Sequence, residues 1–376
     1  MPDESDEPAD STANRRRRGA TGRRRKPRGP RRKALVVTAW AAASVVLAGG
    51  IGLGYVYFKL NGNINGVDIN AALGTDRPDD VDNGSMDILV LGSDSRAGDN
   101  AKYGGADEES ARSDTAMVVH VYEGHKKASV VSIPRDTLVT RPECKSESGG
   151  TDPGGPRHMF NESYSVGGPA CAVKTVEKMS GIRMDHYLEV DFTGFKKLID
   201  ELGGVEITTN KAISDPDSHL DLAAGPHTLD GEQALGLVRT RHAVGDGGDL
   251  GRIQLQQAFI KALINQVKEV GVFTDPTKLY ALADTATSIV TTDSDLDSVK
   301  NLAGFASSLK GIEANHMNMV TLPVIYDPND PNRVVPLEKQ NKQVWAALHA
   351  DKAIPAAATK DSAGDQGEAG SVVSSK

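Results

Sequence analysis

The longest apolar stretch of the chain lies near its N-terminus, where the 25 residues 34–58 include no charged side chain. Wound as an α-helix at 1.5 Å per residue, this stretch spans about 37 Å, which exceeds a hydrocarbon core of roughly 30 Å. Trp40 lies near one end and Tyr55 and Tyr57 near the other, where interfacial aromatic residues belong. The pattern predicts one transmembrane helix. A cleaved signal peptide is the alternative, but its apolar region is usually only about 7–15 residues long.

Beyond this stretch, strand-like and helix-like hydrophobic patterns alternate along the chain. Short β-branched runs predict strands, and apolar residues three or four positions apart predict helices. The expected strands are residues 87–92, 115–122, 128–134, 185–191, 205–209 and 316–322. The expected helices lie within 169–181 and over 193–202, 230–237, 249–270, 276–289, 295–309 and 337–350. Such alternation predicts the α/β class, as a single α-β-α layered domain.

The predicted domain covers residues 86–350 and is flanked by two segments of simpler composition. Residues 59–85 are rich in Asn, Gly and Asp, which is typical of a spacer with at most one short element. Residues 351–376 are rich in Ala, Ser and Gly and are expected to be a disordered tail.

The charges of the chain are unevenly distributed. The whole sequence has a net charge of −8, but residues 1–33 hold twelve basic and five acidic side chains, so this tail is +7 and the rest is −15. The tail lacks an apolar run and is expected to be disordered. Because basic residues mark the cytoplasmic end of a membrane span, the tail is predicted inside the cell and the domain outside. Nuclear localisation or nucleic-acid binding by the tail is the alternative, and the adjacent span and acidic domain disfavour nucleic acid as a partner.

Two cysteines, Cys144 and Cys171, lie on the predicted extracellular side. An oxidising compartment favours a disulfide between them, with two unpaired thiols as the alternative. The segment between them is rich in Gly, Pro and Ser and has little else to order it. In the chain-entropy model, closing a loop of this length contributes roughly 3–4 kcal/mol to stability.

Charged residues recur beside the predicted ends of strands and helices. They are six arginines and four aspartates: Arg96, Arg112, Arg135, Arg239, Arg241 and Arg252, with Asp94, Asp114, Asp136 and Asp249. Each has an ordinary structural explanation, because Asp is common in turns, an Arg-x-Asp sequence is usually a surface ion pair, and Asp249 is placed to cap the helix after it. Gln256 lies four residues beyond Arg252 and shares its helix face.

Taken together, these residues favour binding of a pyrophosphate. The planar guanidinium binds two phosphate oxygens at once, and the carboxylates of Asp94 and Asp114 are hard oxygen ligands suited to a Mg²⁺ ion that bridges the phosphates. The sequence has no phosphate-binding loop of the Gly-x-x-x-x-Gly-Lys type, no Cys/His metal-ligand spacing and no Gly-x-Ser-x-Gly elbow. Ordinary nucleotide triphosphatases, zinc sites and serine hydrolases are therefore disfavoured.

Seven strings in register between residues 87 and 266 make the sequence resemble the LytR-CpsA-Psr family of cell-envelope phosphotransferases. They are DILVLGSDSR, RSDTAMVVHV, SIPRDT, FNESYSVGG, HYLEVDFTGFKKLIDELGGVEI, LDGEQALGLVRTRH and DLGRIQLQQ. The resemblance implies a membrane-anchored extracellular enzyme with an α-β-α fold. Such an enzyme takes a glycopolymer from a polyprenyl-pyrophosphate carrier and joins it to the 6-hydroxyl of N-acetylmuramic acid in peptidoglycan through a phosphodiester, as in teichoic acid attachment.

The resemblance also implies roles for individual residues. Asp94 and Asp114 correspond to Mg²⁺ ligands. The implied pyrophosphate-binding set is Arg96, Arg112, Arg135, Arg239, Arg241, Arg252 and Gln256, and the candidate catalytic residues are Arg112, Arg135, Asp136 and Asp249. Phosphoryl transfer depends mainly on positioning and charge neutralisation, so an Asp near the site, Asp136 or Asp249, is needed only to accept the proton of the acceptor hydroxyl.

One position departs from the family pattern, which often has a second basic residue where this chain has Leu255. The implied lipid pocket has candidates on two predicted helices, with an ordinary core role as the alternative: Phe192, Phe195, Leu198, Phe259, Leu263 and Val267.

Two other functions remain open at this stage. A protein that binds or hydrolyses the lipid pyrophosphate without transfer needs the same arginines. The family's name also reflects an older interpretation as membrane-bound transcription attenuators, which the acidic domain and its predicted location outside the cell disfavour.

Overall fold

The computed structural model of the 376-residue chain describes residues 50–93, 113–146, 149–241, 248–271, 275–365 and 373–374, with Thr38 and Ser44. The chain divides into two compact units, Met1–Tyr55 and Val56–Lys376, and the architecture below is that of the second. Residues 50–63 are helical. Within the described ranges no helix combines the length and the apolar character needed to cross a membrane. The predicted tail 1–33 and most of the predicted span 34–58 lie outside these ranges.

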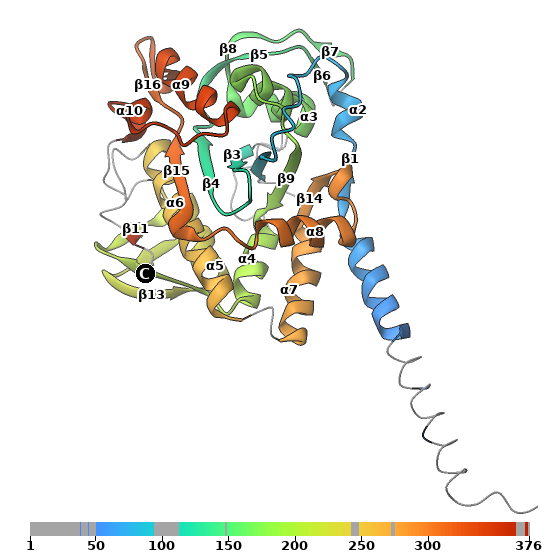
Figure 1. Cartoon of the computed structure of the whole chain (residues 1–376). Coiled ribbons are helices and arrows are strands. Elements are labelled where there is room, and N and C mark those ends of the chain that lie inside the picture. Colours follow the sequence, from blue (N-terminus) through green and yellow to red (C-terminus); the bar gives the residue numbers. More distant parts are fainter. Residues whose placement is uncertain are drawn as a thin grey trace, which may run out of the picture. The chain divides into compact units, whose positions relative to one another are not determined.

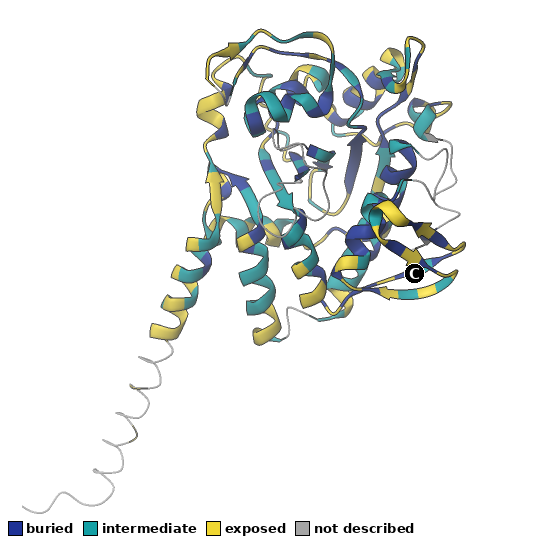
Figure 2. Cartoon of the chain, turned by 180° about the vertical axis from the view of Figure 1, so that it is seen from behind, coloured by how far each residue is buried: buried dark blue, intermediate teal, exposed yellow. Residues whose placement is uncertain are grey.

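A seven-stranded mixed sheet forms the centre of this unit (Figure 1). In order across the sheet, its strands are β1 (Asn65–Val67), β14 (Val290–Asp293), β9 (His186–Asp191), β2 (Met86–Ser93), β3 (Ser113–Val121), β4 (Ala128–Ile133) and β15 (Met317–Thr321). The pairs β1–β14, β9–β2 and β4–β15 are parallel, and the other neighbours are antiparallel. All six residues of β4 are buried, so this strand lies deep in the fold (Figure 2).

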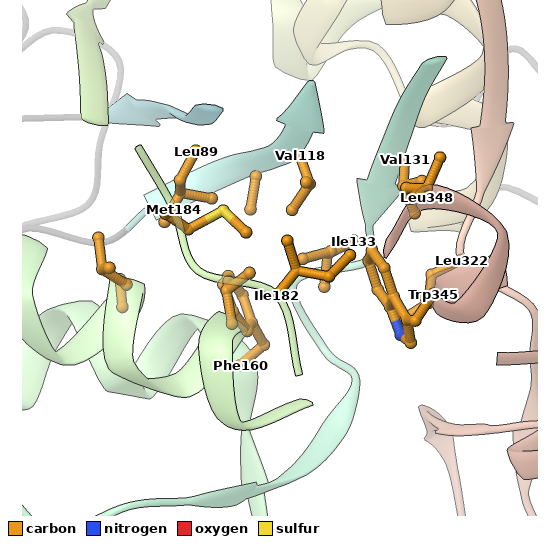
Figure 3. Close-up of a cluster of buried hydrophobic side chains, with 14 of the residues drawn as sticks. Leu89, Val118, Val131, Ile133, Phe160, Ile182, Met184, Leu322, Trp345 and Leu348 are labelled. Atoms are coloured by element: carbon orange, nitrogen blue, oxygen red, sulfur yellow. The ribbon is translucent and has the colours of Figure 1, made fainter. Parts of the chain in front are cut away.

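Helices cover both faces of this sheet. Along β2, Leu89 and Leu91 pack into one apolar cluster while Ile88 and Val90 pack into another, as alternating side chains of a strand must. Figure 3 shows part of the first cluster, in which Trp345 and Leu348 pack over the sheet. The helices of this face are α2 (Ile69–Leu73), α3 (Phe160–Ser180) and α9 (Glu338–His349), and the opposite face is covered by α8 (Val299–Leu309). The predicted α/β class is confirmed.

A further apolar cluster joins three helices to a small sheet of β13 (Gly225–Leu229), β10 (Val205–Thr209) and β18 (Val373–Ser374). The helices are α4 (Phe192–Glu201), α5 (Gly231–Arg239) and α6 (Asp249–Glu269), with the hairpin β11 (Ile213–Asp215) and β12 (Leu220–Leu222) beside them. Helix α5 begins with a reciprocal capping box between Asp230 and Gln233, which sets where it starts.

The remaining elements are short hairpins, one helix beside α4 and several single turns. The hairpins are β5 (Leu138–Arg141) with β8 (Gly155–Met159), β6 (Cys144–Lys145) with β7 (Thr151–Asp152), and β16 (Val324–Asp327) with β17 (Asp330–Pro336). The helix is α7 (Pro276–Ile289). The short turns are α10 (Ala356–Thr359) and 3₁₀ helices at Pro216–Ser218, Ser294–Leu296, Ala314–His316 and Ala363–Asp365.

Helix α3 starts at Phe160, earlier than the predicted 169–181, and it is kinked. Gly167 (φ −141°, ψ 27°) and Gly168 (φ 58°, ψ −151°) leave the helical region, and Pro169 begins the second half. A Cβ on Gly167 would lie 2.5 Å from the carbonyl oxygen of Lys145, so glycine permits β6 to approach the helix. A disulfide between Cys144 and Cys171, with Cα atoms 5.5 Å apart, holds the two elements together.

The segments expected to be a spacer and a disordered tail contain packed residues. Arg77 donates three hydrogen bonds to Glu177 of α3 at 2.5–3.1 Å, and its side chain is only 6% exposed. At the other end, Ile354 and Ala358 are buried in the main core, and Val373 is buried beside β10. These contacts pack the residues named here against the domain, within segments that were predicted as a spacer (59–85) and a disordered tail (351–376).

A buried histidine joins the sheet to the chain after α9. Nδ1 of His120 lies 2.9 Å from Asp87 Oδ1, and Nε2 lies 3.0 Å from Asp351 Oδ1. The imidazole of His120 is fully buried. Burial lowers the pKa of His120, but the two carboxylates outweigh this effect and the pKa is raised above 6.5. The protonated ring donates to both carboxylates and so ties the two segments together.

This histidine predicts a stability that decreases as pH rises. A raised folded-state pKa gives stabilisation that is complete below the unfolded value of 6.5 and is lost as pH rises through the folded value. We expect Asp351→Asn to lower the free energy of unfolding by about 1–3 kcal/mol at pH 6 and by less at pH 9. Urea unfolding of the wild-type and Asp351→Asn proteins at the two pH values measures this difference, from which the contributions of groups unaffected by the substitution cancel.

The matched control for this experiment is Asp361→Asn. Asp361 is exposed and, like Asp351, has a positive φ (61° against 50°), so it shares the backbone conformation but not the histidine contact. An equal loss of stability at both pH values for Asp351→Asn would contradict the role given to His120.

Candidate active site

The candidate site lies at one edge of the central sheet. Because β3 runs antiparallel to β4, with Ala116 opposite Ile133, the start of β3 and the end of β4 meet at the same edge. Asp114 lies at the first of these points and Arg135 just beyond the second. Helix α6 begins beside them, since the backbone N–H of Arg135 donates to Asp249 Oδ2 at 3.2 Å across 114 residues of sequence.

The guanidinium of Arg135 is surrounded by three carboxylates. Its Nη1 donates to Asp114 Oδ1 at 2.7 Å, and its Nε lies 3.5 Å from Asp136 Oδ2 and 3.8 Å from Asp249 Oδ1. Burial lowers the pKa of Arg135, but these carboxylates outweigh it and raise the pKa, so the charge is held. The side chain keeps about a fifth of its surface exposed, which leaves it accessible to a ligand.

Arg252 is the more deeply buried arginine of the site, with 3% of its surface exposed. Its Nη2 forms an ion pair with Asp249 and donates to the backbone oxygen of Asp114 at 2.8 Å. Its Nε has no hydrogen-bond partner among the residues that the structure describes. One turn further along α6, Gln256 donates to Val238 O at 2.9 Å and to Thr115 Oγ1 at 3.1 Å. Helix α6 is thereby tied to both β3 and α5.

These elements enclose a cavity of about 230 Å³. Three of the predicted arginines line it together with one predicted carboxylate, and further polar residues complete the wall. The lining residues are Asp114, Thr115, Phe192, Asp215, Asp217, Ser218, Val238, Arg239, Arg241, Arg252 and Gln256. The guanidinium carbon of Arg239 lies 5.6 Å from the centre of the Phe192 ring, within the range of a cation–π contact. The cavity is therefore lined by charged residues with one aromatic ring beside them.

The electrostatics of the cavity favour an added negative charge. Burial raises the pKa of Asp114, but the charges of Arg252, Arg135 and Arg241 outweigh it and lower the pKa, so this carboxyl stays ionised. The pKa of Arg241 is lowered, first by burial and then by the charges of Arg252 and Arg135. A guanidinium keeps its proton in proteins. The lowered pKa therefore means that the charged Arg241 side chain lies in an unfavourable environment, which a bound anion would improve.

A turn that was not predicted from the sequence positions Arg241. Asp215 Oδ2 accepts the backbone N–H of Arg241 at 3.0 Å, and its Oδ1 accepts from Asp217 N and Ser218 N. Ser218 Oγ lies 2.8 Å from Thr240 Oγ1. The local signal was the Asp-Pro-Asp-Ser sequence, which is typical of a turn, but nothing in it indicated that this turn would lie against the segment after α5.

Several predicted site residues lie outside the described part of the chain. They are Asp94, Arg96 and Arg112. The structure brings together the others: Asp114, Arg135, Asp136, Arg239, Arg241, Asp249, Arg252 and Gln256. Within the described residues, no group of three or more His, Cys, Asp or Glu side chains is arranged to hold a metal ion.

The apolar residues considered for a lipid pocket differ in burial. Phe259 is 1% exposed and belongs to the core between α6 and the small sheet, whereas Phe195 and Leu263 are only partly buried at the edge of that core. Leu255, at the position where the family often has a basic residue, is fully buried in the same core. A basic side chain there would enter an apolar cluster, so in this chain the residue contributes packing.

Comparison with known proteins identifies a family and several relatives of this chain. The sequence model of the LytR_cpsA_psr family matches residues 56–350. The cell wall biosynthesis protein LcpA of Corynebacterium glutamicum is 33% identical over 77% of this chain and 59% of its own length. The probable cell wall biosynthesis protein LcpB of the same organism is 34% identical over 59% of this chain and 51% of its own length. This chain thus spans between half and three-fifths of these two relatives.

Other similar proteins include a transferase and solved structures. The polyisoprenyl-teichoic acid–peptidoglycan teichoic acid transferase TagT of Bacillus subtilis is 32% identical over 78% of this chain and 87% of its own length. A LytR-Csp2A-Psr enzyme from Actinomyces oris has the same fold, with a TM-score of 0.55 at 22% identity over 76% of this chain and 96% of that one. The structure of TagT bound to LIIa-WTA has a TM-score of 0.53 at 25% identity over 73% and 96%.

The match to the family model extends over most of the chain and includes every element that contributes to the candidate site. This chain therefore belongs to the LytR-CpsA-Psr family.

Proposed function

We propose that this protein is a cell-wall glycopolymer transferase that moves a polymer from a polyprenyl-pyrophosphate carrier to peptidoglycan. The observation that carries the proposal is the cavity in which Arg239, Arg241 and Arg252 surround a space beside the ionised Asp114. Guanidinium groups held in this way suit the several oxygens of a pyrophosphate. The similarity to TagT, a polyisoprenyl-teichoic acid–peptidoglycan teichoic acid transferase, supports the choice of substrates.

The arginines account for most of the proposed catalysis. As the bond to the leaving polyprenyl phosphate lengthens, negative charge grows on the phosphate oxygens, and fixed cations stabilise that charge without rearrangement. Arg135 and Arg252 are fixed by Asp114 and Asp249, so their positions do not depend on substrate. Arg96 and Arg112 are proposed to complete this set.

The residues at the site fit a Mg²⁺ ion as well as a phosphate. Asp114 is ionised and lines the cavity, and Mg²⁺ is commonly bound by one or two carboxylates together with substrate phosphates. We propose Asp114 and Asp94 as its protein ligands. When bound, the ion would neutralise charge on the pyrophosphate and on the leaving phosphate.

Asp136 is the favoured proton acceptor for the attacking hydroxyl. Asp249 is engaged by the backbone of Arg135 and by Arg252, which fixes it as a structural partner of the arginines. Asp136 has looser contacts, 3.5 Å to Arg135 and 4.0 Å to Arg333, and so can receive a hydrogen bond from substrate.

The proposed location is the outer face of the cell membrane. The uncharged stretch 34–58 and the basic residues before it support a single span with the N-terminus in the cytoplasm. This arrangement would keep the catalytic domain near a lipid carrier embedded in the same membrane.

Product analysis tests the function directly. We expect the full chain in detergent or vesicles, given a labelled polyprenyl-pyrophosphate glycopolymer, peptidoglycan and Mg²⁺, to place label covalently on the glycan. Release of free polymer phosphate with no labelled glycan would instead identify a pyrophosphatase, and binding without turnover would identify a lipid-binding protein.

Substitution of Arg135 tests its role at the reacting phosphate. Arg135→Lys keeps the charge but loses the planar fork, and we expect kcat/KM for transfer to fall by about 100-fold. Arg135→Ala should lose at least as much. Arg183→Ala, which removes an arginine beside a different cavity, is the control. A folded Arg135→Lys protein with transfer within threefold of wild type would refute the assignment.

Asp114→Asn tests the metal proposal. We expect the Mg²⁺ concentration for half-maximal transfer to rise by about tenfold or more, since one anionic ligand becomes neutral. Binding of Mn²⁺, followed by electron paramagnetic resonance, should weaken in parallel. Asp221→Asn, on the exposed side of β12, is the control. Asp114 also holds Arg135, so Asp114→Asn could act through the arginine. If the Arg135→Lys protein keeps the wild-type Mg²⁺ requirement, the raised requirement of Asp114→Asn is assigned to loss of a metal ligand.

A further inference from the structure

A second hollow adjoins the cavity and is lined by several of the charged residues of the site. It has a volume of about 650 Å³, within the roughly 300–1,000 Å³ typical of ligand sites. Arg241 lines both this hollow and the smaller cavity. The two ion pairs of the site also join them: Arg135 lines the hollow and bonds Asp114 of the cavity, and Asp249 lines the hollow and bonds Arg252 of the cavity.

The hairpin β16–β17 forms the outer wall of the hollow. It contributes Tyr326, whose surface is 44% exposed, together with Asn332 and Arg333. The exposed ring beside Pro331 provides a flat apolar surface, while the amide and the guanidinium supply hydrogen-bonding groups. A ligand that combines apolar ring faces with many hydroxyl or amide groups fits this wall, and a sugar chain has that character.

The hairpin is held in place by contacts with Asp136, Thr137 and β8. The backbone N–H of Val334 donates to Asp136 O at 3.4 Å, and Val334 forms an isolated parallel bridge with Thr137. At the other end, Arg157 of β8 donates to Asp327 at 2.5 Å. The wall is therefore fixed relative to Asp136.

The hollow has a carboxylate that can serve an acceptor hydroxyl. Asp136 and Asp249 line it together with Arg135, Arg241 and Arg333, and Asp136 can accept a hydrogen bond from a hydroxyl. In phosphoryl transfer the attacking and leaving oxygens lie roughly in line, on opposite sides of the phosphorus. With the leaving polyprenyl phosphate in the cavity that Arg239, Arg241 and Arg252 line, the adjoining hollow offers the space from which the acceptor can approach.

We propose that the hollow beneath β16–β17 is the binding site for the acceptor glycan strand. The inference rests on the proposed transferase function. The acceptor hydroxyl gives its proton to Asp136 as its oxygen forms a bond to the sugar-linked phosphorus. The bond from that phosphorus to the bridging oxygen breaks, and polyprenyl phosphate leaves with the electron pair. Tyr326, Asn332 and Arg333 set which glycan is accepted and hold it during the step.

Tyr326→Ala tests the site through the kinetics of each substrate separately. We expect the KM for a soluble peptidoglycan fragment to rise by about five- to tenfold, as expected for loss of an aromatic contact, while the KM for the lipid-linked donor stays within twofold. Ile325→Ala is the matched control, because Ile325 is the preceding residue of β16, is 40% exposed and does not line the hollow. It should leave both constants within twofold of wild type.

A binding measurement without donor keeps the test independent of turnover. Titration of the full chain with the same fragment should give saturable binding that Tyr326→Ala weakens and Ile325→Ala does not. The proposal would be overturned if the two variants had equal KM values for the peptidoglycan fragment, or if only the KM for the lipid-linked donor rose. If wild type binds the fragment but releases only free polymer phosphate, the transferase function fails while the glycan site stands.

Discussion

The pairing of buried guanidinium groups with Asp114 and Asp249 is the interaction on which the site depends. Arg252 is almost fully buried, and a buried charge is tolerated only where partners replace the water that it has lost. Asp249 and the carbonyl of Asp114 provide that replacement, and in doing so they fix helix α6 against the first residues of β3. The same contacts that make the charges tolerable also hold the first turn of α6 in place at the site.

The carboxylates do not fully offset the burial and the neighbouring charges at Arg241, and this has a functional consequence. The pKa of Arg241 is lowered because burial and its two cationic neighbours oppose its charge more than Asp114 and Asp249 support it. Asp215 holds Arg241 through its backbone N–H and so keeps the residue in this unfavourable position. An anionic ligand would remove the conflict. The cations of the site are thus preorganised in the folded protein, as the proposed pyrophosphate binding requires.

Sequence alone indicated the parts of this site that follow from element boundaries. Asp114 and Arg135 were recognisable because they flank β-branched runs, and Gln256 because it lies one helical turn after Arg252. The kink of α3 was not predictable, since Gly167 is explained only by its approach to Lys145, far away in sequence. The packing of the segment before β2 includes a contact between Arg77 and Glu177 that no local pattern encodes. The hairpin β16–β17 was missed because its strands are short and partly exposed, and short strands give little periodic signal.

The existence of two hollows bears on why such a site would transfer a polymer and not hydrolyse its carrier. The arginines that stabilise the leaving phosphate act equally whether the attacking oxygen belongs to water or to a sugar. A carboxylate such as Asp136 can likewise accept a proton from either. Whether the polymer is transferred or its carrier is hydrolysed must therefore depend on which molecule occupies the space in front of Asp136. A wall that binds a glycan displaces water from that space and holds one hydroxyl in position, which converts an encounter into an effectively intramolecular step. In this family member, that role falls to residues outside the charged motifs.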